Sequence, residues 1–409
     1  MSSPALKPAP VNAFLPYGRQ VIEEDDIAAV AEAMRGELLT TGPYVGRFEA
    51  ALCKTVGARH AAVCANGTAA LHMAARALDL GPGTRVIVPA VTFLATASAP
   101  HMNGAQIVFA DVDPETGLML PRDLEAALAR AGQADAVFNV HLNGQCGALE
   151  EIAGIARANG LKIVDDACHA LGTGYVAKDG GVSQIGSNAF CDLSVFSFHP
   201  VKSIAMGEGG AVTANDGELA AKLVRARNHG MIRDPAAFVN AGDAFDADGT
   251  PNPWYYELHR PEFNWRANDI QCALGLSQLG KLGRFVARRR LLAAHYDTLL
   301  APHAPLIRPL ARTRPCLPAW HLYAVRLDFA RIDVSRARVM RALAERGIGT
   351  QVHYVPVHRQ PYYADAFPTP KLPGAERYYA RCLSLPLYAS MTVDDVERVV
   401  AALGDVVGF

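Results

Sequence analysis

The chain has almost no net charge and few lysines. Its 39 basic and 40 acidic residues leave a net charge of −1, and only eight residues of 409 are lysine. Nucleic acids and acidic membrane surfaces are recognised through clustered positive charge, so this balance argues against both as partners. No apolar run approaches the roughly 18 residues of a membrane span, and the first ten residues lack a basic-then-apolar signal pattern. We therefore expect a cytoplasmic protein.

Paired cysteines and clustered metal ligands are also lacking. The eight cysteines are scattered singly, without a CxxC pair, which is typical of small buried side chains in a reducing compartment rather than of a disulfide framework. His353 with His358, or His141 with Cys146, could begin a metal site. Neither pair has a third or fourth ligand at a recognised spacing, so we predict no metal.

Short apolar runs alternate with amphipathic segments from residue 60 onward. Continuous apolar strands separated by helices indicate an α/β domain with a largely parallel sheet. We expect a helix at residues 23–35 before this region. Within it we expect strands at 60–64, 85–89, 106–110, 136–140 and 161–165, and helices at 68–80, 121–131 and 150–159.

The pattern changes after a segment at 269–300 that predicts one long helix, with a kink at Gly280 or Gly283. Strands are expected at 320–328 and 350–355, and helices at 335–346 and 393–407. Residues 243–253 are rich in Gly, Asp and Pro and predict a loop. We infer a flexible tail at residues 1–12, a large α/β domain at 13–285 and a smaller α+β domain at 286–409.

Lys202 stands in the window SFHPVK, followed by the glycine-rich GEGG at residues 207–210. An amine among apolar and aromatic groups loses solvation, so its pKa falls and its neutral, nucleophilic form becomes accessible. Such a lysine can form a Schiff base, and pyridoxal phosphate (PLP) is the commonest reason for a protein to make one. Taken alone, this window favours an ordinary surface lysine.

Other segments could supply the remaining parts of a PLP site. Gly67 and Thr68 lie between a predicted strand and helix, where free N–H groups bind phosphate, although a plain helix cap is the alternative. Asp166 ends a buried strand and could face a pyridine nitrogen. His169 could reach the ring hydroxyl, although a lone histidine is more often structural. Phe93 could stack on the ring, and an ordinary core phenylalanine is an equal alternative.

Six motifs occur in an order that resembles the DegT-type nucleotide-sugar aminotransferases. These proteins have the fold-type I architecture of aspartate aminotransferase, with a large, mostly parallel sheet domain and a smaller C-terminal α+β domain. The resemblance covers roughly residues 15–407, and the ordered set is far more specific than any one member. The motifs are NGTAAL (66–71), VTFLAT (91–96), DDACHA (165–170), SFHPVK (197–202), GEGG (207–210) and NWRANDIQ (264–271).

The resemblance implies roles for individual residues. Lys202 would hold PLP as the internal aldimine, and Asp166 would face the pyridine nitrogen. His169 would contact the ring hydroxyl side, while Phe93 would stack on the ring. The phosphate would be bound by Gly67, Thr68, Ser197 and, from the neighbouring subunit, Asn264. A site completed by two subunits makes a homodimer the expected active unit.

The resemblance also implies a reaction. A narrower resemblance is carried by YGRQ (17–20), LTTGP (39–43), RNHG (227–230), PWYY (253–256) and HYVPVH (353–358) with QPYY (360–363). These segments are similar to the branch that transfers the amino group of L-glutamate to C4 of a UDP-linked 4-keto-6-deoxy-N-acetylhexosamine, on the route to pseudaminic acid. Transfer at C3 or to another keto sugar stays open, as does a PLP-binding regulatory protein without turnover. A sugar 3-dehydratase would carry His in place of Lys202. Sugar selection is expected to depend on loops around Tyr17, His229, Trp254 and Tyr354.

Overall fold

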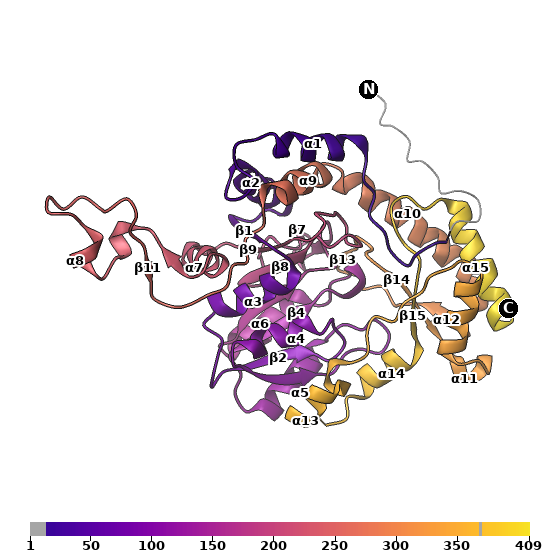
Figure 1. Ribbon diagram of the computed structural model, residues 1–409. Coiled ribbons are helices and arrows are strands. Elements are labelled where there is room, and N and C mark those ends of the chain that lie inside the picture. The colour runs from indigo at the N-terminus through magenta and orange to yellow at the C-terminus, as the bar shows by residue number, and fades with distance from the viewer. Residues whose placement is uncertain (1–13, 368–369) are drawn as a thin grey trace.

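A seven-stranded sheet forms the centre of the larger part of the protein (Figure 1). The computed structural model describes residues 14–367 and 370–409, so the predicted tail at 1–12 lies outside the described residues. The strand order is β1-β9-β8-β5-β4-β2-β3, and only β9 runs antiparallel to its neighbours. The predicted, mostly parallel α/β sheet is confirmed. Its strands are β1 (His60–Cys64), β2 (Arg85–Pro89), β3 (Gln106–Ala110), β4 (Ala136–Val140), β5 (Lys162–Asp166), β8 (Leu193–Ser197) and β9 (Gly210–Ala214).

Helices cover both faces of this sheet because its strands are apolar on both sides. Val86 and Val88 of β2 face a core shared with helices α3 (Gly67–Ala77) and α4 (Ala95–Met102). Ile87, between them, faces the opposite core with α5 (Pro121–Ala131) and α6 (Leu149–Ala158). Successive side chains of a strand point to opposite faces, so burial of all three requires helices on each side.

The smaller part is an antiparallel sheet with helices, as predicted. Strands β12, β14 and β15 pair in that order, and their buried side chains share one core with helices α10, α12 and α15. The elements are β12 (Ile307–Pro309), β14 (Tyr323–Leu327), β15 (Cys382–Leu385), α10 (Leu282–Leu300), α12 (Arg336–Glu345) and α15 (Val393–Val407).

Helix α10 belongs to both parts. Leu282 and Val286, near its start, pack in a core with residues of the large sheet, whereas Leu292 and Tyr296 pack in the core of the small sheet. The domain boundary proposed between residues 285 and 286 therefore falls inside a continuous helix.

Several details differ from the sequence-based expectations. The segment at 269–300 forms two helices, α9 (Asp269–Leu279) and α10, which separate at Gly280 and Lys281. Residues 350–355 are not a strand, because only Gln351 pairs with Ser384 of β15 and the residues that follow line a cavity. Helix α4 was not predicted, since its eight residues contain Pro100 and lack a clear apolar stripe.

An arm leaves the large sheet after helix α7 (Gly217–Arg227) and extends away from the body of the molecule (Figure 1). We define it as residues 231–258, from strand β10 (Met231–Ile232) to strand β11 (Glu257–Leu258), which pair antiparallel. The predicted loop at 243–253 lies at its far end. Across residues 14–367 and 370–409, no helix has both the length and the apolar character needed to cross a bilayer.

Candidate active site

A cavity of about 860 Å³ lies where parallel strands of the large sheet end and the small part begins. In open α/β sheets ligands bind at the carboxyl ends of the strands, and Asp166 and Ser197 are the last residues of β5 and β8. The small part contributes the wall at residues 351–355. Nine predicted site residues line the cavity: Tyr17, Gly67, Thr68, Phe93, Asp166, His169, Ser197, Lys202 and Tyr354.

The start of helix α3 forms a phosphate-sized cradle. Asn66 caps the helix by accepting the N–H of Ala69 at 2.9 Å, which leaves the N–H groups of Gly67 and Thr68 at the positive end of the helix dipole. A Cβ on Gly67 would stand 2.9 Å from Cβ of Ser197, so only glycine permits this approach. Backbone donors and a serine hydroxyl thus converge where a phosphate is favoured.

Lys202 lies in the turn that follows β8, with its side chain partly buried. Burial lowers the pKa of its amine, and the nearby Cys168 and Asp166 oppose that shift without cancelling it. Within the described residues Nζ makes no hydrogen bond or ion pair of the usual lengths. A desolvated amine without a fixed partner is suited to nucleophilic attack on a carbonyl.

Asp166 is held by a chain of buried hydroxyl groups. Its Oδ2 accepts the hydroxyl of Thr96 at 2.6 Å, and the Thr96 oxygen lies 2.7 Å from that of Thr92. Its Oδ1 accepts the backbone N–H of Cys168 at 3.2 Å. These donors hold the carboxyl group in a fixed orientation, in which it could pair with a protonated ring nitrogen.

His169 is a neutral imidazole in a defined tautomer. Its Nδ1 accepts the N–H of Asn143 at 3.3 Å, so the ring proton is on Nε2, which donates to the Tyr354 hydroxyl at 3.1 Å. Its ring packs on His321 with centroids 4.3 Å apart. Burial lowers the pKa of His169 well below its usual range, and Lys202 adds to this. The group can therefore serve as a hydrogen-bond partner that carries no charge.

Aromatic side chains form the mouth of the cavity. Phe93, which is 51% exposed, lies 5.9 Å from Tyr354 between ring centroids. Tyr17 lies 5.4 Å from His353 by the same measure. Burial raises the pKa values of both tyrosine hydroxyls, so they remain protonated and able to donate hydrogen bonds at neutral pH.

Three predicted residues lie outside this cavity. Trp254 is on the arm and is 74% exposed, while His229 and Asn264 belong to its root, where Asn264 pairs with Asn228. The side chains of His229 and Asn264 are also exposed. The structure thus separates the predicted residues into a cavity set and an arm set.

Sequence reasoning assigned no role to four polar residues at the cavity. Thr92, His321 and His353 line it, and Thr96 contacts the lining residues Thr92 and Asp166. Both threonines flank Phe93 in the VTFLAT motif, so their spacing was a usable signal. His353 bonds Ser384 through Nδ1 at 2.8 Å, and burial lowers its pKa to about 3. Nothing in the sequence places His321 against His169, because the contact spans 152 positions.

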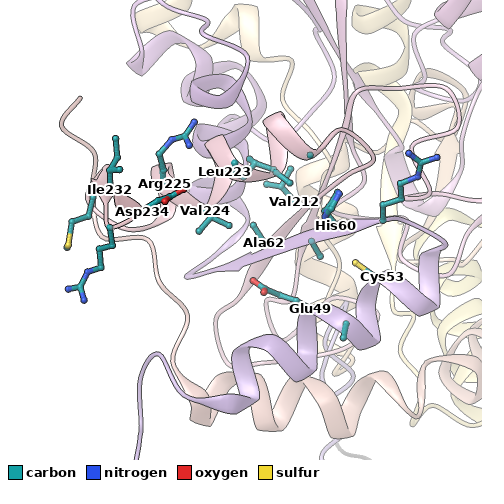
Figure 2. A pocket seen from close by; sticks show the side chains of 18 of the residues that line it. Glu49, Cys53, His60, Ala62, Val212, Leu223, Val224, Arg225, Ile232 and Asp234 are labelled. Atoms are coloured by element: carbon teal, nitrogen blue, oxygen red, sulfur yellow. The ribbon is translucent and has the colours of Figure 1, made fainter. Parts of the chain in front are cut away.

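A second cavity, of about 800 Å³, lies beside the edge strand β1 (Figure 2). Helix α2 (Pro43–Val56), helix α7 and the first residues of the arm surround it. Its wall contains Glu49, Cys53, His60 and Arg225 and none of the predicted site residues. The chemistry described above is therefore confined to the first cavity.

Comparison with known proteins places the chain in a family. A model described as the DegT/DnrJ/EryC1/StrS aminotransferase family matches residues 20–404. The spore coat polysaccharide biosynthesis protein SpsC of Bacillus subtilis is 38% identical over 399 residues, which cover 97% of this chain and 98% of that protein.

Solved structures agree with this placement. PseC of Helicobacter pylori, an aminotransferase involved in the biosynthesis of pseudaminic acid, superimposes with a TM-score of 0.86 and 28% identity, covering 96% of this chain and 99% of that one. Spr1654 of Streptococcus pneumoniae, solved in PLP and PMP forms, gives a TM-score of 0.82 at 25% identity over 96% of this chain and 97–98% of that one.

The cradle, the hydrogen-bonded Asp166 and the partly buried amine fit PLP, which is the cofactor of this family. The fold-type I architecture predicted from the motifs is confirmed by the same structures. Since the family model extends over nearly the whole sequence, the protein belongs to the DegT/DnrJ/EryC1/StrS aminotransferase family and is a PLP-dependent aminotransferase of nucleotide sugars.

Proposed function

We propose that the protein transfers the amino group of L-glutamate to C4 of a UDP-linked 4-keto-6-deoxy-N-acetylhexosamine, forming UDP-4-amino-4,6-dideoxy-N-acetyl-β-L-altrosamine for pseudaminic acid synthesis. The likeness to PseC over 96% of the chain supports this substrate. The observation that carries the chemistry is the lowered pKa of the Lys202 amine in a cavity that also contains the Gly67 cradle and Asp166.

The residues of the cavity have distinct tasks in this proposal. PLP, when bound, supplies a carbonyl group and an electron-withdrawing ring. Gly67, Thr68 and Ser197 would bind its phosphate, and Asp166 would pair with its ring nitrogen. Nζ of Lys202 would hold it covalently and, once free, would take a proton from the α-carbon of glutamate. The same amine later returns a proton to C4 of the sugar, so it acts as both base and acid.

Neutral side chains in the walls of the cavity suit the sugar ring of the acceptor. The imidazoles of His169, His321 and His353 are kept neutral because burial lowers their pKa values. The hydroxyls of Tyr17 and Tyr354 are kept protonated. Hydroxyl and acetamido groups of a sugar need this type of neutral donor and acceptor.

The active unit in this proposal is a cytoplasmic homodimer with composite sites. Asn264, His229 and Trp254 are exposed at the arm and its root, and Asn264 from one subunit would reach the phosphate in the other. A protruding arm with exposed apolar side chains supports a partner surface. All eight cysteines are free, which supports a reducing compartment.

A different nucleotide sugar is the second candidate. It is favoured by SpsC, which is 38% identical and named for spore coat polysaccharide biosynthesis. Transfer at C3, or to a sugar on another nucleotide, would use the same Lys202 chemistry.

Glutamate-dependent turnover of a panel of UDP-, dTDP- and GDP-linked 4-keto sugars tests the proposal, with the configuration of the product at C4 determined by NMR. We expect the UDP-linked 4-keto-6-deoxy-N-acetylhexosamine to react with the highest kcat/KM. Lys202→Ala is the control and should lack both the visible band of the bound cofactor and turnover.

Preference for a dTDP- or GDP-sugar would overturn the proposed UDP-linked substrate, and the assignment as an aminotransferase would still hold. Turnover by Lys202→Ala would overturn the assignment of the amine. Binding of PLP without conversion by glutamate would identify a regulatory protein.

A further inference from the structure

The hydrogen bonds around Asp166 have a fixed direction. A carboxylate can only accept, so the hydroxyl of Thr96 must donate to Oδ2 across their 2.6 Å contact. The Thr96 proton is then committed, and Thr92 must donate to the Thr96 oxygen across 2.7 Å. Thr92, Thr96 and Asp166 are 2%, 0% and 6% exposed, so water does not compete for these bonds.

The position of the two threonines is determined by the start of helix α4. Thr92 precedes the helix and Thr96 lies in its first turn, and the chain between them brings their hydroxyl oxygens to 2.7 Å from each other. Asp166 ends β5, which pairs with β4 and β8. The chain of hydroxyls therefore joins a helix that opens beside the cavity to the strand that carries the acid.

We propose that Thr92 and Thr96 form a two-hydroxyl relay that positions Asp166 for the ring nitrogen of PLP. Thr96 is the positioning residue in direct contact, and Thr92 orients Thr96. The inference rests on the proposed role of Asp166. The relay sets which Asp166 oxygen is free to meet the cofactor, because Oδ2 is occupied by Thr96 and Oδ1 has only a long bond from the N–H of Cys168 at 3.2 Å.

The test compares Thr96→Val, which keeps the shape but removes the hydroxyl, with Thr96→Ser, which keeps the hydroxyl and removes a methyl group. Cofactor affinity is measured by equilibrium titration of the apo-protein with PLP, and glutamate conversion is followed separately. A hydrogen bond to a charged group contributes enough to predict roughly ten-fold weaker PLP binding for Thr96→Val. Thr96→Ser should bind PLP within about two-fold of the wild type, because the donor is retained.

Thr92→Val is a milder variant, which tests the relay even if Thr96→Val fails to fold. It should weaken PLP binding by about two- to three-fold, because it removes only the second hydroxyl. We also expect kcat for the glutamate half to fall in Thr96→Val with KM for glutamate unchanged, since Asp166 acts on the ring and not on the donor. Thermal unfolding of each apo-variant reports whether the fold is intact.

Equal losses in Thr96→Val and Thr96→Ser would show that packing and not the hydroxyl matters, and would overturn the relay. Wild-type affinity in Thr96→Val would do the same. Asp166→Asn separates the two levels of the argument. If it binds PLP and converts glutamate normally, the role of Asp166 itself is wrong; if it is impaired while Thr96→Val is not, only the relay is wrong.

Discussion

At the scale of single residues, the clearest feature of the site is a set of three buried histidines whose imidazoles are neutral. His169, His321 and His353 are 7%, 3% and 6% exposed, and burial is the first cause of the lowered pKa in each. Lys202 adds to the effect on all three. Because these rings bind protons more weakly in the native protein than in the unfolded chain, the free energy of unfolding falls as the pH is lowered.

This has a measurable pH dependence. Burial lowers the pKa of His353 from 6.5 to about 3. Between these two pH values the imidazole is protonated in the unfolded chain and neutral in the native protein. Stability is therefore lost as pH falls from about 6.5 toward 3, by up to about 1.4 kcal/mol per pH unit from this group. His353→Gln should flatten that slope in urea unfolding experiments at pH 6 to 4. Parallel slopes for the two proteins would contradict the assignment.

The sequence predicts individual site residues well where neighbouring residues in the chain carry the signal. Asp166 and Gly67 stand at the ends of elements that the apolar pattern locates, Lys202 was found from the residues around it, and the structure places all three in one cavity. The bond between Thr96 and Asp166 spans 70 positions, and no local pattern encodes it. Its discovery required the pairing of strands, which brings the end of β5 beside the start of α4.

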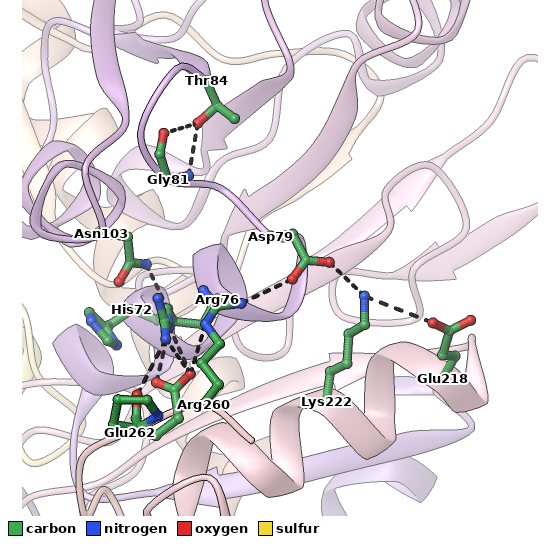
Figure 3. Close-up of polar contacts among 11 residues, drawn as sticks. His72, Arg76, Asp79, Gly81, Thr84, Asn103, Glu218, Lys222, Arg260 and Glu262 are labelled. Carbon is green, nitrogen blue, oxygen red and sulfur yellow. Dashed lines mark hydrogen bonds and ion pairs between the residues drawn. The ribbon is translucent and has the colours of Figure 1, made fainter. Parts of the chain in front are cut away.

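At the scale of elements, helix α3 connects the cradle with the root of the arm. Its first turn presents Gly67 and Thr68, and Arg76 in its last turn donates to both carboxylate oxygens of Glu262 at 2.8 and 3.0 Å (Figure 3). The side chains of this pair are 17% and 8% exposed. Glu262 lies two residues before Asn264, so the pair fixes the segment that carries the predicted phosphate ligand.

We expect Glu262→Gln to be destabilising, because it leaves the partly buried Arg76 without its counter-charge. The loss in free energy of unfolding should be about 2 kcal/mol. Lys222→Gln is the matched control. Its partner Asp79 is 2.7 Å away, with side chains 29% and 59% exposed, so the loss should stay below about 1 kcal/mol. If urea unfolding gave the same loss of unfolding free energy for Glu262→Gln and Lys222→Gln, the Arg76–Glu262 pair would not stabilise the fold more than a surface ion pair does.

Several elements with a strong local signal were predicted, and some elements that depend on tertiary contacts were not. Strands β2, β3 and β4 begin and end at the predicted residues because each is a short, mainly apolar run. Helix α4 contains Pro100 and β9 runs against the direction of its neighbours, and both depend on the packing around them. The expected strand at 350–355 was wrong because residues 351–355 line the cavity and only Gln351 pairs with a strand.

At the scale of the whole molecule, the predicted residues of the arm set are outside the cavity that they should serve. Exposed apolar side chains surround the same region, including Trp254, Tyr256, Leu258 and Phe263 at 74%, 53%, 58% and 57% exposure. A second subunit that covers this surface and receives the arm would explain both facts, and the proposal of a composite site depends on it.

Mixed dimers test this arrangement. If Asn264 serves the partner's site, a hybrid of Lys202→Ala and Asn264→Ala subunits contains one site with both wild-type groups. Random reassociation of equal amounts should then restore about a quarter of wild-type turnover at limiting PLP. The two separate variants provide the baseline. Activity no higher than the average of these baselines would place Asn264 in the site of its own subunit.

Helix α10 has a consequence for how the enzyme selects its sugar. Because one unbroken helix enters both hydrophobic cores, there is no flexible joint between residues 282 and 300 about which the two parts could swing. The cavity takes its walls from both parts, so we expect its width to change little when a ligand binds. Discrimination between sugars would then depend on shape complementarity with a preformed cavity. Substitutions that widen or narrow the cavity should change sugar specificity without any change in domain movement.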